Sequence, residues 1–128
     1  GLTAFTVAVT RRRPFEASLE RVVQSGRPYT VEGERVHNVF TLHLVNKRPG
    51  PRTFTVAVTG PAAAETVVAM TEVELASLAD RRVPVHVYVP LDAFRAGLRS
   101  ELTVVCREPE GDDLSRLATA PLLGPTRR

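Results

Sequence analysis

The chain has 128 residues, of which 43% are hydrophobic and 24% charged, with a formal net charge of +3. This length supports one domain with a substantial core and excludes two. Tryptophan is absent and only 5% of the residues are aromatic, so the core must consist mainly of valine, leucine and alanine side chains.

The basic isoelectric point of about 9.7 comes from the ends of the chain. Five of the 17 basic residues are Arg11, Arg12, Arg13, Arg127 and Arg128. The other 12 stand against 14 acidic residues, which gives residues 14–126 a net charge of −2. A body without excess positive charge lacks the footprint of a nucleic-acid-binding surface.

Residues 1–10 are uncharged and mostly apolar, and three arginines follow them. The alternation of Phe5, Val7 and Val9 permits a short strand. The same stretch fits the last turns of a membrane helix equally well, with the arginines at the interface. We interpret residues 1–13 as a membrane-proximal stump or linker and residues 126–128 as a tail.

Seven segments alternate apolar and polar residues, as half-buried strands do. They cover residues 14–20, 36–45, 53–59, 66–70, 83–89, 101–107 and 114–122. The clearest pair flanks the Pro/Gly-rich residues 46–51. Residues 21–33 are interpreted as a polar connection with a possible short extended piece at residues 29–31.

Two further segments lie outside these seven strands. Residues 72–80 fit either a strand with a turn or one helical turn, and we favour the strand because the clearest alternation follows directly. Residues 92–97 predict a single helical turn with Asp92 as N-cap and Gly97 as the stop.

These elements predict an all-β fold, an immunoglobulin-like antiparallel β-sandwich of about seven strands over residues 14–125. Cys106 is the only cysteine, and there is no tryptophan. The disulfide and tryptophan of antibody domains are therefore missing. A single cysteine also excludes a cysteine-based structural zinc site and iron–sulfur ligation within this chain.

The run from residue 33 to residue 47 is the most distinctive part of the sequence. Its spaced glycine, apolar and asparagine residues resemble the C-terminal domain of the FixG (CcoG) family, the accessory proteins of cbb3-type cytochrome oxidase assembly. Residues 123–125, Leu-Gly-Pro, resemble the end of that domain. The matching motif is structural rather than catalytic, and its main positions are Gly33, Val36, Asn38, Phe40, Leu42 and Asn46.

The resemblance implies a membrane protein with ferredoxin-like cysteine clusters upstream and this domain on the periplasmic side, tethered by a membrane helix. Arg11, Arg12 and Arg13 would favour a cytoplasmic domain by the positive-inside rule. Because that rule is a bias summed over loops, we keep the extracytoplasmic expectation. Cofactors are expected only in the upstream part, as iron–sulfur clusters. The expected partner is an oxidase subunit or another assembly factor.

A metal site is the sharpest alternative, because the resemblance concerns a copper oxidase. The candidate ligands are His37, His43, His86, Met70 and Cys106. Six residues of strand separate His37 from His43 by roughly 20 Å, so these two cannot bind one ion. We expect all three histidines to face outward, with His37 and His43 towards solvent or a neighbouring edge. We expect Met70 and Cys106 to fill the core, and we predict no metal ligands.

The sequence contains no nucleophile-elbow motif and no glycine-rich phosphate loop, and residues 108–113 are interpreted as an acidic turn. We therefore predict no catalytic residues and no enzymatic activity. Asn38 and Asn46 share the face of Phe40, so we expect buried amides that hold a loop or a strand crossing. Two classes of function remain: a protein-interaction module, or a β-sandwich that binds copper or a small molecule.

Overall fold

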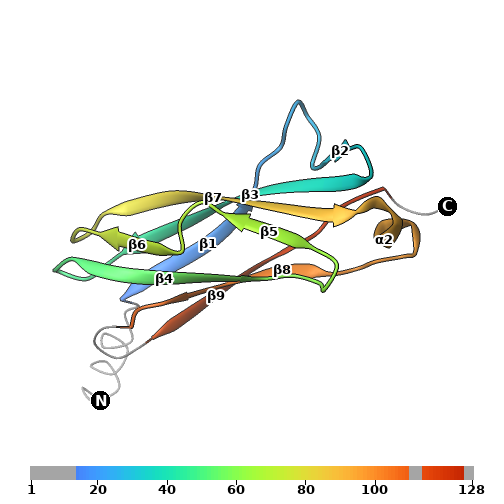
Figure 1. Cartoon of the computed structure of the whole chain (residues 1–128). Coiled ribbons are helices and arrows are strands. Elements are labelled where there is room, and N and C mark those ends of the chain that lie inside the picture. Colours follow the sequence, from blue (N-terminus) through green and yellow to red (C-terminus); the bar gives the residue numbers. More distant parts are fainter. Residues whose placement is uncertain (1–13, 110–113, 126–128) are drawn as a thin grey trace, which may run out of the picture.

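The structure is a computed structural model that describes residues 14–109 and 114–125. Within these residues, nine strands form two antiparallel sheets packed face to face, with one short helix at one end (Figure 1). The predicted immunoglobulin-like sandwich is confirmed. The predicted stump at residues 1–13 and the tail at residues 126–128 lie outside the described residues.

The first sheet has β3 and β7 at its centre. Its strand order is β1 (Phe15–Arg21), β3 (Arg35–Asn46), β7 (Asp80–Pro90) and β5 (Glu65–Val68). The short strand β2 (Thr30–Glu32) pairs with the first residues of β3, beyond the end of β1. The long strand β3 therefore carries two successive neighbours along one edge.

The second sheet has the order β6 (Glu72–Leu75), β4 (Arg52–Thr59), β8 (Glu101–Arg107) and β9 (Ser115–Pro121). Among the described strands, each connection from β3 to β8 leads from one sheet to the other, and the shortest of them, between β5 and β6, spans residues 69–71. Strands β1 and β9 approach each other along one side of the sandwich.

The structure has two short strands more than the seven predicted. Strand β2 corresponds to the candidate extended piece at residues 29–31, and β6 settles the ambiguous segment at residues 72–80. The favoured reading of that segment, a strand and then a turn, is confirmed by β6 and by the turn before β7.

The core lies between the sheets and follows the period-two alternation of the strands. Phe15 and Phe54 face each other across it, with ring centroids 4.9 Å apart. Each fully buried side chain of this size contributes about 1.5–3 kcal/mol. The other fully buried apolar residues are Val36, Phe40, Leu42, Leu44, Val73, Val83, Val85, Val87, Val89, Leu102, Val104 and Cys106.

The helix α2 (Leu91–Arg95) directly follows β7. The predicted N-cap was wrong: Pro90 holds that position, and Asp92 lies inside the first turn with no capping hydrogen bond. Because β7 extends to Pro90, the helix starts earlier than the aspartate suggested. Gly97, with a φ of +95°, ends the turn as predicted. Among the described residues, no helix is long and apolar enough to cross a bilayer.

Candidate functional site

The Asn46 side chain joins two loops at one end of the sandwich. Its Nδ2 donates to the carbonyl oxygens of Gly50 (3.0 Å), Leu75 (3.2 Å) and Ala76 (3.1 Å). Its Oδ1 accepts a hydrogen bond from the backbone N–H of Arg48 at 2.9 Å. Asn46 is fully buried, so its amide is satisfied entirely by backbone groups, as the alternation predicted.

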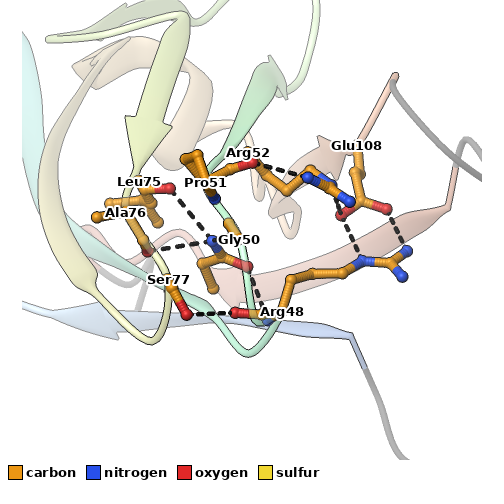
Figure 2. A network of polar contacts seen from close by, with 9 residues as sticks. Arg48, Gly50, Pro51, Arg52, Leu75, Ala76, Ser77 and Glu108 are labelled. Atoms are coloured by element: carbon orange, nitrogen blue, oxygen red, sulfur yellow. Dashed lines mark hydrogen bonds and ion pairs between the residues drawn. The ribbon is translucent and has the colours of Figure 1, made fainter.

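Glu108 lies beside this network and is also fully buried. Arg48 donates to both of its carboxylate oxygens, from Nη2 at 2.6 Å and from Nε at 3.0 Å (Figure 2). Arg52 Nε lies 3.9 Å from the same carboxylate. The prediction of an acidic turn starting at residue 108 was wrong for Glu108, because an arginine 60 residues away in the sequence neutralises it.

Asn38 performs a similar task at the other end of the sandwich. Its Nδ2 donates to the carbonyl oxygen of Leu123 at 2.9 Å, and its Oδ1 accepts the Leu123 N–H at 3.0 Å. Arg21 Nη1 also donates to this Oδ1, at 2.7 Å. Gly124, which follows Leu123, packs closely against the Phe94 ring: a Cβ at this position would lie 2.6 Å from the ring. The Leu-Gly-Pro segment is thereby held against the sandwich.

The other motif residues also serve the fold. Gly33 has a φ of +66° in the turn between β2 and β3, a conformation that favours glycine. Val36, Phe40 and Leu42 are fully buried in the core. The residues of the motif thus form the turn before β3, bury one face of this strand in the core and bind the loops beside it.

Four side chains stack on the outer face of the first sheet, alternating between β3 and β7. The Arg35 guanidinium lies 4.4 Å from the centroid of the Tyr88 ring, and Tyr88 stacks on His37 at 4.3 Å. His37 in turn stacks on His86 at 5.0 Å. The four side chains Arg35, Tyr88, His37 and His86 therefore form one continuous stack on this face.

His37 is hydrogen-bonded through both ring nitrogens. Its Nδ1 contacts Glu32 Oε2 at 2.6 Å, and its Nε2 contacts His86 Nδ1 at 2.8 Å. His37 lies on the outward face as expected, but against the neighbouring strand β2 rather than in solvent, since it is only 7% exposed. Its strand parity was interpreted correctly, but Tyr88, His86 and β2 cover the ring. The hydrogen bond from His37 is the main reason why the pKa of Glu32 is lowered.

The candidate metal ligands are arranged in different surroundings. Glu32, His37 and His86 form a series in which both nitrogens of the middle ring are occupied, so they do not converge on one point. His43 lies further along β3 and contacts Asp80 Oδ2 at 2.6 Å, which lowers the pKa of that carboxyl. Across residues 14–109 and 114–125, no three or more His, Cys, Asp or Glu residues are grouped to hold a metal ion.

The two sulfur-containing residues belong to the core and its margin. Cys106 is fully buried, and burial raises the pKa of its thiol to about 11. Met70 is partly buried against the core, and Arg81 Nη1 lies 3.7 Å from its sulfur. A protonated, enclosed thiol is a poor nucleophile and a poor metal ligand.

Residues 22–29, the β1–β2 connector, rise above the body of the sandwich (Figure 1). Gln24 and Arg27 exchange two backbone hydrogen bonds, of 2.9 and 2.8 Å. Ser25 and Gly26 between them both have positive φ, +51° and +78°, as a type I′ hairpin turn requires. The connector is therefore a tight hairpin rather than the plain polar connection that the sequence suggested.

The connector carries side chains that the core does not use. Val23 is 58% exposed, and Val31 just beyond the connector, in β2, is 48% exposed. A groove of about 470 Å³ is lined by Arg27, Pro28, Tyr29 and Val31. The Ser-Gly pair was the available sequence signal for the hairpin, but the groove depends on how β2 docks beside β3.

Comparison with known proteins gives a consistent assignment of the fold. Residues 5–125 match a family model described as "IG-like fold at C-terminal of FixG, putative oxidoreductase". A crystal structure of a FixG-related protein from Vibrio parahaemolyticus superposes with a TM-score of 0.69 at 13% identity, covering 88% of this chain and 97% of that one. At that identity the structural similarity shows the fold alone.

Two further solved structures are more distant. The PapD-like domain 7 of human CEP192 has a TM-score of 0.45 at 14% identity, with 85% of this chain and 80% of that chain covered. The GAE domain of yeast GGA1 has a TM-score of 0.46 at 14% identity, with coverages of 83% and 99%. A search of curated proteins finds no match.

Proposed function

This chain belongs to the family of immunoglobulin-like domains at the C-terminus of FixG, and from that premise we propose that it is a non-catalytic docking module used in cytochrome oxidase assembly. In this proposal the domain lies on the extracytoplasmic side of the membrane, tethered by an upstream helix. It contacts an oxidase subunit or another assembly factor. Any redox chemistry of the parent protein takes place outside this domain.

The observation that carries the proposal is the contrast between buried and exposed groups. The buried side chains of Asn38, Asn46 and Glu108 bind the domain's own loops and strand ends. The β1–β2 connector and the adjoining strand β2, in contrast, combine a hydrogen-bonded backbone with the half-exposed Val23 and Val31 and a groove. A loop that is ordered by its base and presents unused apolar surface is typical of recognition sites.

Co-purification from membranes tests the proposal. The full-length parent protein should retain oxidase subunits or assembly factors, and replacing residues 23–28 by a Gly/Ser segment of equal length should reduce their recovery at least tenfold. A matched control carries Arg82→Gln, an exposed change on β7 away from the connector. If the parent lacking the entire domain retained these proteins at the wild-type level, the docking proposal would be wrong.

Copper titration distinguishes the competing function. Anaerobic titration of the chain with Cu(I) and with Cu(II) should give no stoichiometric site of sub-micromolar affinity. A site of that kind, lost in His86→Ala or Met70→Ala, would replace the docking proposal by a copper-binding one. His86→Ala is the sharper variant, because His86 is the end of the Glu32–His37–His86 series.

A further inference from the structure

We propose that the β1–β2 connector binds an extended acidic segment of its protein partner, with one apolar side chain in the groove and a carboxylate on Arg27. This inference rests on the proposed docking function and adds the binding surface and the chemistry of the partner.

The apolar half of the binding surface is the groove itself. Its apolar lining is formed by Pro28, Tyr29 and Val31, and this solvent-open groove has a volume of about 470 Å³, within the range of small binding pockets. Proline and tyrosine present rigid surface with few rotatable bonds, so little side-chain entropy is lost on binding. The groove therefore favours an apolar side chain over a charged one.

The charge of the connector selects the flanking residues. Arg27 is the only charged residue among the four that line the groove. The nearby carboxylate of Glu32, at the end of β2, is already bound by the His37 ring. The Arg27 guanidinium makes no hydrogen bond or ion pair with another residue in the described part of the chain. Guanidinium groups bind carboxylates through two parallel hydrogen bonds. A basic partner segment would instead be repelled, which leaves an acidic segment as the complementary occupant.

The connector is held in place before any partner binds. Val22 N–H donates to Val39 O at 2.9 Å, and Arg21 Nη1 donates to Pro28 O at 2.7 Å. On the β2 side of the hairpin, Glu32 contacts His37 at 2.6 Å. These contacts fix both ends of the hairpin, so binding does not require ordering a disordered loop.

Strand β2 explains why the bound segment should be extended. Its three residues, Thr30 to Glu32, pair with β3 only, according to the strand pairings of the described residues. A strand with one paired edge offers backbone N–H and C=O groups along the other, and an extended peptide can use them. Val31 lies at the centre of this strand and in the groove lining.

The test uses the ¹⁵N-labelled 128-residue chain and two acetylated, amidated hexapeptides. The first is Glu-Asp-Val-Leu-Glu-Asp, and the second is Gln-Asn-Val-Leu-Gln-Asn, which differs only in charge. We expect the amide signals of residues 27–31 to shift, with at least tenfold tighter binding of the acidic peptide at low salt. Raising the ionic strength should reduce that preference.

Substitutions separate the two halves of the surface. Arg27→Gln should remove the preference for the acidic peptide, and Val31→Ser should weaken both peptides by a similar factor. Arg82→Gln, an equal loss of charge on β7, should leave both affinities unchanged. The amide spectrum of each variant reports whether the sandwich is intact.

Three results would overturn the inference: equal affinity for the two peptides, signal shifts that map to another surface, or no saturable binding up to millimolar peptide.

Co-purification then distinguishes the two proposals. If the parent carrying both Arg27→Gln and Val31→Ser still retained its partner, only this inference would fail. If deletion of the entire domain had no effect on partner recovery, the docking proposal itself would fail.

Discussion

Two loop regions at opposite ends of the sandwich use their side chains in opposite ways. At the end formed by the exits of β3 and β8, polar side chains are buried and bind one another and the backbone (Figure 2). At the other end, the β1–β2 connector is hydrogen-bonded at its base but keeps its outer side chains exposed. The first region stabilises the fold, while the second offers surface to a partner.

This difference shows that order in a loop does not reveal its role. Both loops have fixed backbones, so a comparison of flexibility would not separate them. What separates them is whether the side chains are used within the domain. Substitutions of these side chains should therefore reduce stability in the first region and leave it nearly unchanged on the exposed surface of the second.

The largest expected effect comes from removing Glu108. Glu108→Leu leaves the Arg48 guanidinium, which is largely buried, without its carboxylate, and should lower the free energy of unfolding by about 3 kcal/mol. Adding Arg48→Met should recover part of this loss, because an apolar pair has no uncompensated charge. Urea unfolding of both variants measures the difference. A loss below about 1 kcal/mol in the single variant would mean that the ion pair is not structural.

The next largest effect is expected at Asn46. Asn46→Ala removes the donor to the carbonyl oxygens of Leu75 and Ala76 in a buried site, and should cost about 2–3 kcal/mol. Lys47→Ala is the matched control at the neighbouring position, where an exposed ion pair with Glu16 should contribute less than about 1 kcal/mol. Similar losses in the two variants would contradict the assigned role of Asn46.

A smaller, pH-dependent effect is expected at the base of the connector. Hydrogen bonding by His37 lowers the pKa of Glu32 in the folded protein. The stabilisation is therefore complete above the ordinary glutamate pKa and is lost as the pH falls through the lowered value. Between pH 5 and pH 3, the urea midpoint of the wild type should fall more steeply than that of Glu32→Gln. Parallel curves would show that the contact does not stabilise β2.

The smallest effect on stability is expected at the exposed valines of the connector and of β2. The double variant Val23→Ser, Val31→Ser changes two half-exposed side chains and should shift the free energy of unfolding by less than about 0.5 kcal/mol. The same variant should lose partner co-purification. A loss of stability above about 1.5 kcal/mol would mean that the valines pack on the core, and it would remove the contrast between the two ends.

Much of the fold could be predicted from local patterns. The alternation along residues 36–45 placed Asn38 and Phe40 on the inward face, and both are fully buried. Glu108 was missed although the same pattern was informative, because residue 108 continues the inward row of Leu102, Val104 and Cys106. The acidic residues that follow it in the sequence hid that signal.

The candidate site was much less accessible to such reasoning. His37 and His86 are 49 residues apart in the sequence, and their contact depends on the register in which β3 meets β7. The groove beside Tyr29 depends on a three-residue strand too short to be predicted with clear bounds. The alternation of apolar and polar residues along one strand contains no information on the strand register or on the groove.

The sequence alone determined which side chains of each strand point inward, because that property follows from the two-residue period of an extended chain. The tertiary structure decided which of those side chains meet: Glu108 with Arg48, Asn38 with Leu123, and Glu32 with His37. Strand pairing and sheet packing set these contacts through relations between distant segments. The polar network and the exposed connector surface therefore exist only once the two sheets have come together.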